Sequence, residues 1–393
     1  MIDLQNLPEG FHENPFPHYD NLLREAPVAP QSDGSVVLSR HADLTRVYKD
    51  TGLFTSDKRV VFKPKFGVES ELYEHHTTSL VFNDPPLHTK VRQIMSSALT
   101  PRAITQLQPG LIDSVEALLE TMQQSPDLIE DFAAQIPIQI IGNLLDIPMA
   151  DRGPLRGWSL AILGALEPVL TTEQLAQGNQ AVADFKVYLK ELIAHRRQNP
   201  GDLETDVLTR LITGDASGKL SEIELIQNCI FILNAGHETT TNLIGNSLAL
   251  LHDYPDVQHR LRKNPDLIAG CVEEVLRVAS PNQFGNRETS QDIEMHGISI
   301  RKGTNLHLCI GAANRDPEVF ENTNTIDITR KPNRHLAFAG GPHVCVGLTL
   351  ARLEARVALE CFLKRVRSYR IVNRVQGGRI RFRGFKALRA EVA

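Results

Sequence analysis

One uninterrupted helical pattern near the middle of the chain constrains the architecture more than any other feature. Ser221 and Glu224 have the spacing of a capping box, in which the two side chains cap each other's backbone N–H groups, and this marks a helix start. The pattern continues to about Asp253, which at 1.5 Å per residue gives a rod of roughly 48 Å. A helix this long must cross the whole molecule, so we expect a mainly helical body around it.

Further helices and several short strands are expected around this rod. A helix should begin at Asp84, which is placed to cap it, hold Pro85 and Pro86 in its first turn, and stop before Pro101. Residues 63–78 are rich in charge and show no clear period, so they are expected to form a loop. Strands are indicated by alternation, β-branched residues and flanking turns at residues 27–29, 36–38, 293–296, 298–300, 305–310 and from 371 onward.

The expected fold class is mainly α with small β-sheets. No boundary divides the chain, so we expect one domain over residues 1–393, with a small β-rich part, about 27–60 and 290–345, packed on the helical body. Composition excludes some functions. The chain has 42 Lys and Arg against 47 Asp and Glu, a net charge of -5 that argues against binding nucleic acid.

Targeting features and cysteine usage point to the cytoplasm. The first seventeen residues lack the apolar stretch of a signal peptide, and no run approaches the roughly 18 apolar residues of a membrane span. The five cysteines include no CxxC pair and do not form a disulfide framework. Four of them stand in apolar stretches and are expected in the core: Cys229, Cys271, Cys309 and Cys361.

The fifth cysteine stands in a glycine-rich segment, Phe-Ala-Gly-Gly-Pro-His-Val-Cys-Val-Gly, over residues 338–347. A helix is expected over residues 348–366, so Cys345 lies just ahead of a helix N-terminus. Unpaired N–H groups there supply the positive potential that a thiolate needs. Gly340, Gly341 and Gly347 should let the backbone approach a flat macrocycle closely. Cys345 is therefore a candidate metal ligand.

This segment resembles the haem loop of the cytochrome P450 family, Phe-x-x-Gly-x-His/Arg-x-Cys-x-Gly. The matching positions are Phe338, Gly341, His343, Cys345 and Gly347. The resemblance covers essentially the whole chain and implies a P450-type fold with haem b beneath the long helix. It also implies that Cys345 is the proximal iron ligand, and that Phe338, His343 and Gly347 contact the cofactor. Ala339 departs from the pattern, because close bacterial relatives usually have glycine there.

The long helix contains Ala235-Gly-His-Glu-Thr-Thr-Thr, in which small residues leave room beside the helix. Threonine hydroxyls can bond i−4 carbonyls and loosen the helix. Taken alone, a threonine here is commonly just back-bonded, and a glutamate is commonly a solvated charge. The resemblance implies more: Glu238 and Thr239 would relay protons to dioxygen, and Ala235 would face the cofactor.

Two further residue sets receive roles from the resemblance. Haem propionates attract cationic groups and N–H donors, and the family pattern assigns this role to His88, Arg92, Arg287 and His343. Glu274 and Arg277, at i and i+3, read by spacing alone as an exposed pair worth a few tenths of a kcal/mol. In the family the pair is buried behind the haem loop, with Arg330 as the candidate third member.

The substrate is expected to be a small, mostly hydrophobic organic molecule such as a terpenoid, an aromatic compound or a fatty acid. By resemblance, the candidate contacts are Val81, Phe82, Leu233, Asn234, Asn282, Phe284 and Phe385. Asn234 is unusual, because that position is typically aliphatic. It either bonds a polar group of the substrate or faces another helix.

The expected reaction is a monooxygenation with dioxygen. No sequence motif binds a flavin or nicotinamide, so a ferredoxin-type donor with a separate reductase is implied, and a monomer is expected. A basic set around the haem loop could steer an acidic donor: Arg334, His335, Arg352 and Arg356. Two alternatives stay open: a peroxygenase that uses hydrogen peroxide, and a non-catalytic haem sensor. A zinc hydrolase is poorly supported, because the chain has 14 histidines but no HExxH.

Overall fold

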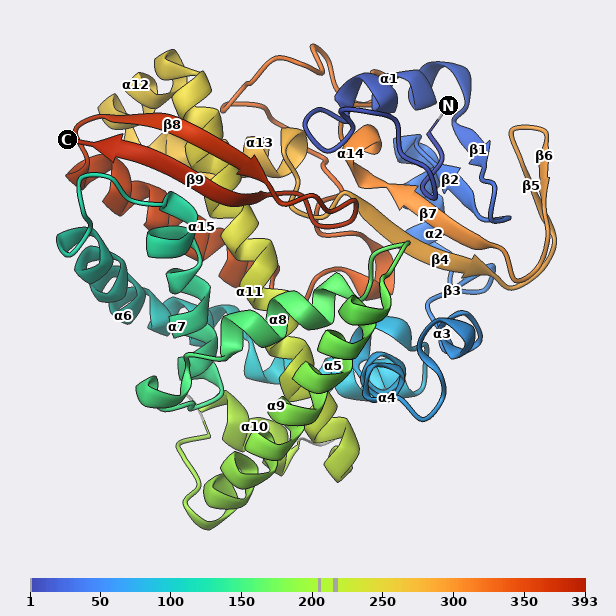
Figure 1. The fold of residues 1–393 in the computed structure, drawn as a ribbon, viewed down its shortest axis with the longest axis horizontal. Helices are drawn as coiled ribbons and strands as arrows, with labels where there is room; N and C mark the ends of the chain where they lie inside the picture. Colours follow the sequence, from blue (N-terminus) through green and yellow to red (C-terminus); the bar gives the residue numbers. More distant parts are fainter. Residues whose placement is uncertain (1, 204–205, 215–217) are drawn as a thin grey trace.

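The computed structural model describes residues 2–203, 206–214 and 218–393. Most of these residues are helical, and the strands form three small sheets, which confirms the expected fold class. Figure 1 shows the five-stranded sheet and α1 at one end of the molecule, with the helical body at the other. No helix among the described residues is long and apolar enough to cross a membrane.

The helices follow one another with short connections. Those before the long helix are α1 (Phe16–Glu25), α2 (His41–Lys49), α3 (Arg59–Phe66), α4 (Glu71–Thr78), η1 (Leu80–Phe82), α5 (Leu87–Ala98), α6 (Pro101–Glu120), η2 (Leu128–Ala133), α7 (Gln135–Leu144), η3 (Met149–Asp151), α8 (Leu155–Gly164), α9 (Thr172–Gln198) and α10 (Val207–Thr213). The remaining ones are α11 (Glu222–Asp253), α12 (Pro255–Lys263), η4 (Pro265–Leu267), α13 (Ile268–Val278), α14 (Ile310–Ala313), η5 (Gly341–His343) and α15 (Leu348–Arg365).

The largest sheet joins strands from both ends of the chain in the order β1-β2-β7-β4-β3. Its strands are β1 (Val28–Pro30), β2 (Val36–Leu38), β3 (Phe54–Thr55), β4 (Phe284–Thr289) and β7 (Asn305–Cys309). Two hairpins complete the β-structure: β5 (Ile293–Met295) with β6 (Ile298–Ile300), and β8 (Tyr369–Gln376) with β9 (Phe385–Val392). Each strand predicted from the sequence is present, to within a few residues at its ends.

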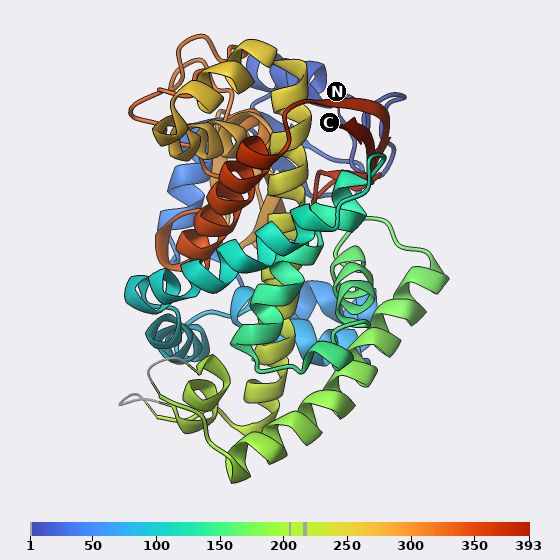
Figure 2. The same cartoon turned by 90° about the vertical axis from the view of Figure 1, so that its left-hand side faces the viewer.

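Helix α11 is the rod expected from the sequence. It begins after Ser221, whose side chain forms the predicted capping box with Glu224. It contacts α4, α7, α8, α9, α13 and α15, so it lies at the centre of the helical body. Figure 2 shows it running along the length of the molecule with α15 crossing beside it. Most residues of α11 are buried, which its apolar composition allows.

Two predictions about residues 63–86 were wrong. The segment taken for a loop contains the end of α3 and all of α4, because Ser70 caps α4 through the Tyr73 N–H and the two helices bury Phe66 and Leu72. Asp84 does not cap α5. Its carboxylate accepts hydrogen bonds from the backbone N–H of Ser56 at 3.1 Å instead, which ties the start of α5 to the chain that follows β3.

Candidate functional site

Cys345 lies between η5 and α15, with its thiol on the wall of a cavity of about 690 Å³. Its backbone N–H donates to the Phe338 carbonyl at 3.0 Å, which closes the loop on itself. Burial raises the pKa of the Cys345 thiol, while the Gly347 N–H, Arg92 and Arg352 act in the opposite direction. A metal ion on the sulfur would remove its proton, since metal ligation requires the thiolate.

The glycines of this loop serve a purpose that the sequence did not reveal. A Cβ on Gly341 would lie 2.0 Å from the Tyr48 carbonyl oxygen at the end of α2, and its φ is +64°. Glycine is therefore required by the packing of the loop on α2, and the expectation that Gly341 serves approach to a macrocycle was wrong. Ala339 has φ 57°, a left-handed conformation that costs an alanine on the order of 1 kcal/mol.

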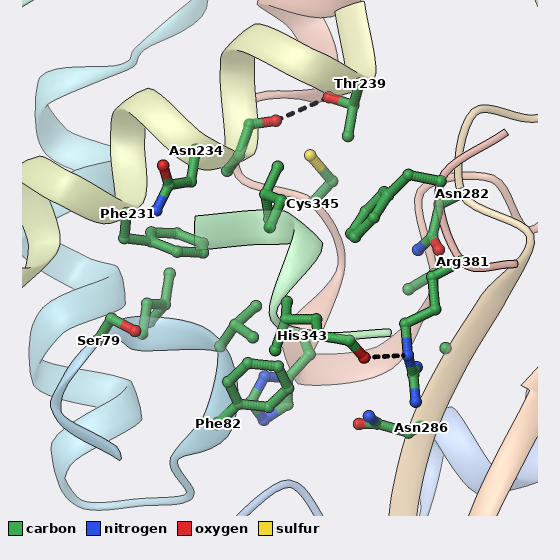
Figure 3. Close-up of a pocket in the computed structure, with 18 of the residues that line it drawn as sticks. Ser79, Phe82, Phe231, Asn234, Thr239, Asn282, Asn286, His343, Cys345 and Arg381 are labelled. Atoms are coloured by element: carbon green, nitrogen blue, oxygen red, sulfur yellow. Dashed lines mark hydrogen bonds between the residues drawn. The ribbon is translucent and has the colours of Figure 1, made fainter. Parts of the chain in front are cut away.

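The wall opposite Cys345 is one face of α11. Phe231, Ala235 and Thr239 follow one another at four-residue intervals, and all three line the cavity. Figure 3 shows the Cys345 sulfur directed toward this part of α11. The Thr239 hydroxyl donates to the Ala235 carbonyl at 2.7 Å, and its oxygen lone pairs are free to accept from water or a ligand.

Glu238 does not line the cavity. Its carboxylate accepts from Arg379, in the turn between β8 and β9, at 2.5 and 2.6 Å, and its side chain is almost fully buried. Burial raises the pKa of Glu238 to about 7, although Arg379 acts in the opposite direction. The group therefore exchanges protons near neutral pH, but it lies beside the cavity and not in it.

Four groups that the sequence assigned to propionates come together at the cavity: His88, Arg92, Arg287 and His343. The imidazoles of His88 and His343 have centroids 3.9 Å apart, and their buried Nε2 atoms lack a hydrogen-bond partner. Asp84 Oδ1 lies 3.7 Å from His343 Nε2. Burial lowers the pKa of Arg92 and of Arg287. Unpaired donors and cations beside a thiol fit a flat cofactor that carries carboxylates.

A buried ion-pair network lies behind the loop. Arg277 donates to both oxygens of Glu274 at 2.9 and 2.8 Å, and neither side chain is exposed. Arg330 Nε approaches the same carboxylate at 3.3 Å, and the Asn333 side chain and the Asp327 N–H also donate to it. Arg277 further donates to three backbone carbonyls of residues 314–325, so it ties α13 to the segment that leads into the loop.

Five of the candidate substrate contacts line the cavity: Val81, Phe82, Asn234, Asn282 and Phe284. Leu233 and Phe385 do not. Leu233 is fully buried in the core, because two residues of helix turn it about 200° away from Ala235. Phe385 begins β9 and packs against the core, whereas Arg381 and Phe382, in the preceding turn, line the cavity.

Asn234 bonds another helix. Its Nδ2 lies 3.3 Å from Nε2 of His75, in α4, whose Nδ1 lies 2.9 Å from Gln227 Oε1. Asn234 Oδ1 is buried without a partner. Burial lowers the pKa of His75 to about 4, so this imidazole is neutral at physiological pH.

Sequence reasoning missed Phe231, Lys65 and Arg381 as lining residues. The four-residue spacing from Thr239 back to Phe231 would have found the first of them. No comparable signal existed for Lys65 and Arg381. They come from α3 and the β8–β9 turn, far apart in the sequence.

Comparison with known proteins identifies what the site resembles. The family model for Cytochrome P450 matches residues 160–368. The "Biotin biosynthesis cytochrome P450" of Bacillus subtilis (strain 168) is 36% identical over 384 residues, covering 96% of this chain and 95% of the relative. The crystal structure of P450BioI in complex with hexadec-9Z-enoic acid ligated acyl carrier protein superimposes with TM-score 0.92 and 33% identity, covering 98% and 99% of the two chains. The structure of the bacillaene polyketide synthase cytochrome P450 PksS from Bacillus subtilis 168 gives TM-score 0.90 and 30% identity, covering both chains fully, at 100%.

Proposed function

The chain belongs to the cytochrome P450 family of haem-thiolate monooxygenases, and on this premise we propose that it hydroxylates or otherwise oxidises a small, mostly hydrophobic organic substrate with electrons from a ferredoxin-type donor and its reductase. Haem b is the cofactor, and when bound it supplies the iron that activates dioxygen. The observation that carries the proposal is the placement of the Cys345 thiol and Thr239 on facing walls of one cavity.

Each residue of the proposed site has a defined task. Cys345 ligates the iron. His88, Arg92, Arg287 and His343 hold the propionates, and Ala235, Phe338 and Gly347 contact the ring. The buried network of Glu274, Arg277 and Arg330 braces the loop from behind.

Proton delivery is assigned to Thr239 and Glu238. The Thr239 hydroxyl faces the cavity and can pass a proton to a bound reactant while accepting another from water. Glu238 is proposed to reload this path. Its pKa of about 7 suits proton exchange at neutral pH, and movement of the Arg379 side chain would expose its carboxylate to water.

The substrate contacts proposed are those that line the cavity: Val81, Phe82, Asn234, Asn282 and Phe284. The lining is largely apolar, which supports a hydrophobic substrate. P450BioI has been crystallised with an acyl carrier protein bearing hexadec-9Z-enoic acid, and CYP109E1 from Bacillus megaterium with testosterone. A fatty-acyl chain or a fused-ring molecule is the class we propose.

The donor is proposed to approach the face around α15, but this face is less basic than its sequence. Arg352 donates to Glu273 at 2.6 and 2.8 Å, and His335 lies 3.2 Å from the same carboxylate. Arg334 is the exposed cation of the set. We expect the turnover rate with a ferredoxin to fall as salt is added, and a rate independent of ionic strength would contradict steering by charge.

We propose that the protein acts as a monomer in the cytoplasm. All five cysteines are free, as in a reducing compartment. A peroxygenase or a haem sensor has less support, because the relatives are monooxygenases. Rates with hydrogen peroxide that exceed those with electron donors would favour the peroxygenase.

The experiment that tests the proposed function is Thr239→Ala, with Thr241→Ala as its matched control. Both hydroxyls donate to the carbonyl four residues earlier, at 2.7 and 2.9 Å, but Thr241 is buried away from the cavity. For any compound that shifts the Soret band, we expect Thr239→Ala to retain haem yet divert most of the electrons consumed into hydrogen peroxide. Unchanged coupling in Thr239→Ala, or equal loss in both variants, would contradict the relay.

A further inference from the structure

Two cations face one end of the cavity, where it approaches the surface. Lys65 lies in the last turn of α3, and Arg381 lies in the turn between β8 and β9. Lys65 and Pro168 line both the main cavity and a shallow surface depression formed with residues 170–175 of the α8–α9 connection. Figure 3 shows Arg381 beside Asn282 and Asn286, on the side of the cavity away from α11. We call Lys65 and Arg381 the entrance cations.

The entrance cations are bonded only to neutral groups. Arg381 Nε donates to the Leu166 carbonyl at 2.9 Å, and its Nη1 to the Phe284 carbonyl at 3.4 Å. Lys65 Nζ donates to the Glu167 carbonyl at 2.7 Å. Within the described part of the chain, no carboxylate lies within ion-pair distance of either cation. Backbone carbonyls satisfy their N–H groups without neutralising their charges.

The nearest carboxylate is already engaged. The Glu167 side chain accepts from the backbone N–H groups of Ile380 and Arg381 at 2.9 and 3.3 Å, which fastens the α8–α9 connection to the β8–β9 turn. One carboxylate therefore stands against two cations, and it bonds the backbone and not their side chains. Burying a charge without a matching anion costs several kcal/mol, so a positive excess here favours an anionic ligand.

The titration of neighbouring groups agrees with this excess. Burial lowers the pKa of Lys65 to about 7, with Arg381 acting in the same direction and Glu167 against it. Burial also lowers the pKa of Arg381. His307, in β7, is held neutral by burial and then by the charges of Arg381, Lys58 and Lys65.

We propose that Lys65 and Arg381 form a subsite for the anionic end group of the substrate, whose apolar part extends through the cavity toward Thr239 and Cys345. This inference rests on the proposed function, and it narrows the substrate to a long apolar molecule ending in an oxyanion. The oxyanion is either the carboxylate of a free acid or the phosphate of an acylated phosphopantetheine arm. A planar guanidinium and an adjacent ammonium suit both groups.

The test compares dodecanoic acid, S-dodecanoyl phosphopantetheine and the uncharged methyl dodecanoate on the holoenzyme. Dissociation constants come from calorimetry and from the Soret shift. We expect Arg381→Gln to weaken binding of the preferred anion at least tenfold and Lys65→Gln several-fold, with the ester unchanged within twofold. Lys63→Gln, an exposed cation of the same helix that does not line the cavity, is the matched control and should change nothing. Tighter binding of the acid or of the thioester identifies the source of the anion.

A variant that keeps the charge separates recognition from folding. Arg381 also secures backbone carbonyls, so Arg381→Lys should restore much of the affinity if charge is what the subsite supplies. Equal losses for the anions and the ester, or anions that bind no tighter than the ester, would overturn the subsite. The proposed function would stand if the ester were still oxidised. Tight binding of an anion without oxidation of any compound would contradict the proposed function alone.

The subsite also predicts a pH dependence. Lys65 gains its charge as pH falls through about 7, while Arg381 stays charged and His307 stays neutral. Affinity for dodecanoic acid should therefore rise as pH is lowered from above 8 to 6, where the acid is still ionised. Lys65→Gln should remove this rise, and a rise that persists in the variant would contradict the role of Lys65.

Discussion

The two ends of the cavity are built in different ways. The thiol side comes from ten consecutive residues, 338–347, closed by a local bond from Cys345 to Phe338 and packed against α2. The entrance comes from α3, the α8–α9 connection and the β8–β9 turn, so Lys65, Glu167 and Arg381 meet only in the folded protein. The group that fixes the reaction class is thus local in sequence, whereas the groups proposed to select the substrate are not.

The comparison predicts that the thiol side is held by fold-determining contacts, and Glu274→Gln is its strongest test. The change leaves the fully buried Arg277 without a carboxylate and should lower the free energy of unfolding by about 3–5 kcal/mol. Urea denaturation and haem content report it. Glu273→Gln is the control, since Glu273 pairs with Arg352 at the surface and should cost about 1 kcal/mol or less. Equal effects of the two variants would contradict a special brace behind the loop.

Glu354, in α15, sharpens the same contrast through pH. Burial raises the pKa of its carboxyl to about 8, against an ordinary value of 4.5. A raised folded-state pKa gives stability that is present below the unfolded value and lost as pH rises through the folded one. From pH 5 to pH 8, the wild type should lose about 3 kcal/mol relative to Glu354→Gln. Glu360→Gln, on the exposed side of α15, should show much less, and parallel pH curves for wild type and Glu354→Gln would be contrary to this account.

A smaller effect is expected within the loop itself. Ala339→Gly should raise the free energy of unfolding by about 1 kcal/mol, because glycine adopts the left-handed conformation of residue 339 without steric cost. Ala337→Gly, at a residue without positive φ, should be destabilising by about 0.5–1 kcal/mol. Thermal unfolding of the two variants gives the signs, and matching signs would show that φ at residue 339 is not the cause.

The smallest effect belongs to the wall opposite the thiol. Thr239→Ala removes one hydrogen bond within α11 and should change the free energy of unfolding by no more than about 0.5 kcal/mol, while uncoupling the reaction. Denaturation of Thr239→Ala beside Glu274→Gln tests the division directly. A loss of several kcal/mol from Thr239→Ala would show that the opposite wall also holds the fold.

The same division explains what could be predicted from the sequence. The capping box at Ser221 and the alternation in residues 298–300 are local patterns, and the structure contains both elements. Helix α4 was missed because its apolar residues are few and its capping residue, Ser70, lies within a charged segment. Asp84 was misassigned because its carboxylate bonds the Ser56 N–H, a partner distant in sequence.

Within the site, motif positions were placed well and non-motif positions poorly. Thr239 and Phe82 line the cavity, but Phe385 does not, because the β8–β9 turn presents Arg381 and Phe382 in its place. Which residue of a turn faces a cavity depends on the register of the hairpin beneath it. That register is set by pairing between residues 369–376 and 385–392, which the local pattern did not specify.

The ligation of iron by Cys345 is the central claim, and the ferrous carbon monoxide spectrum of the holoprotein tests it most directly. We predict the red-shifted Soret band of a thiolate-ligated haem in the wild type and its loss in Cys345→Ala. A wild-type spectrum typical of histidine ligation, or correctly folded protein that takes up no haem, would contradict the account.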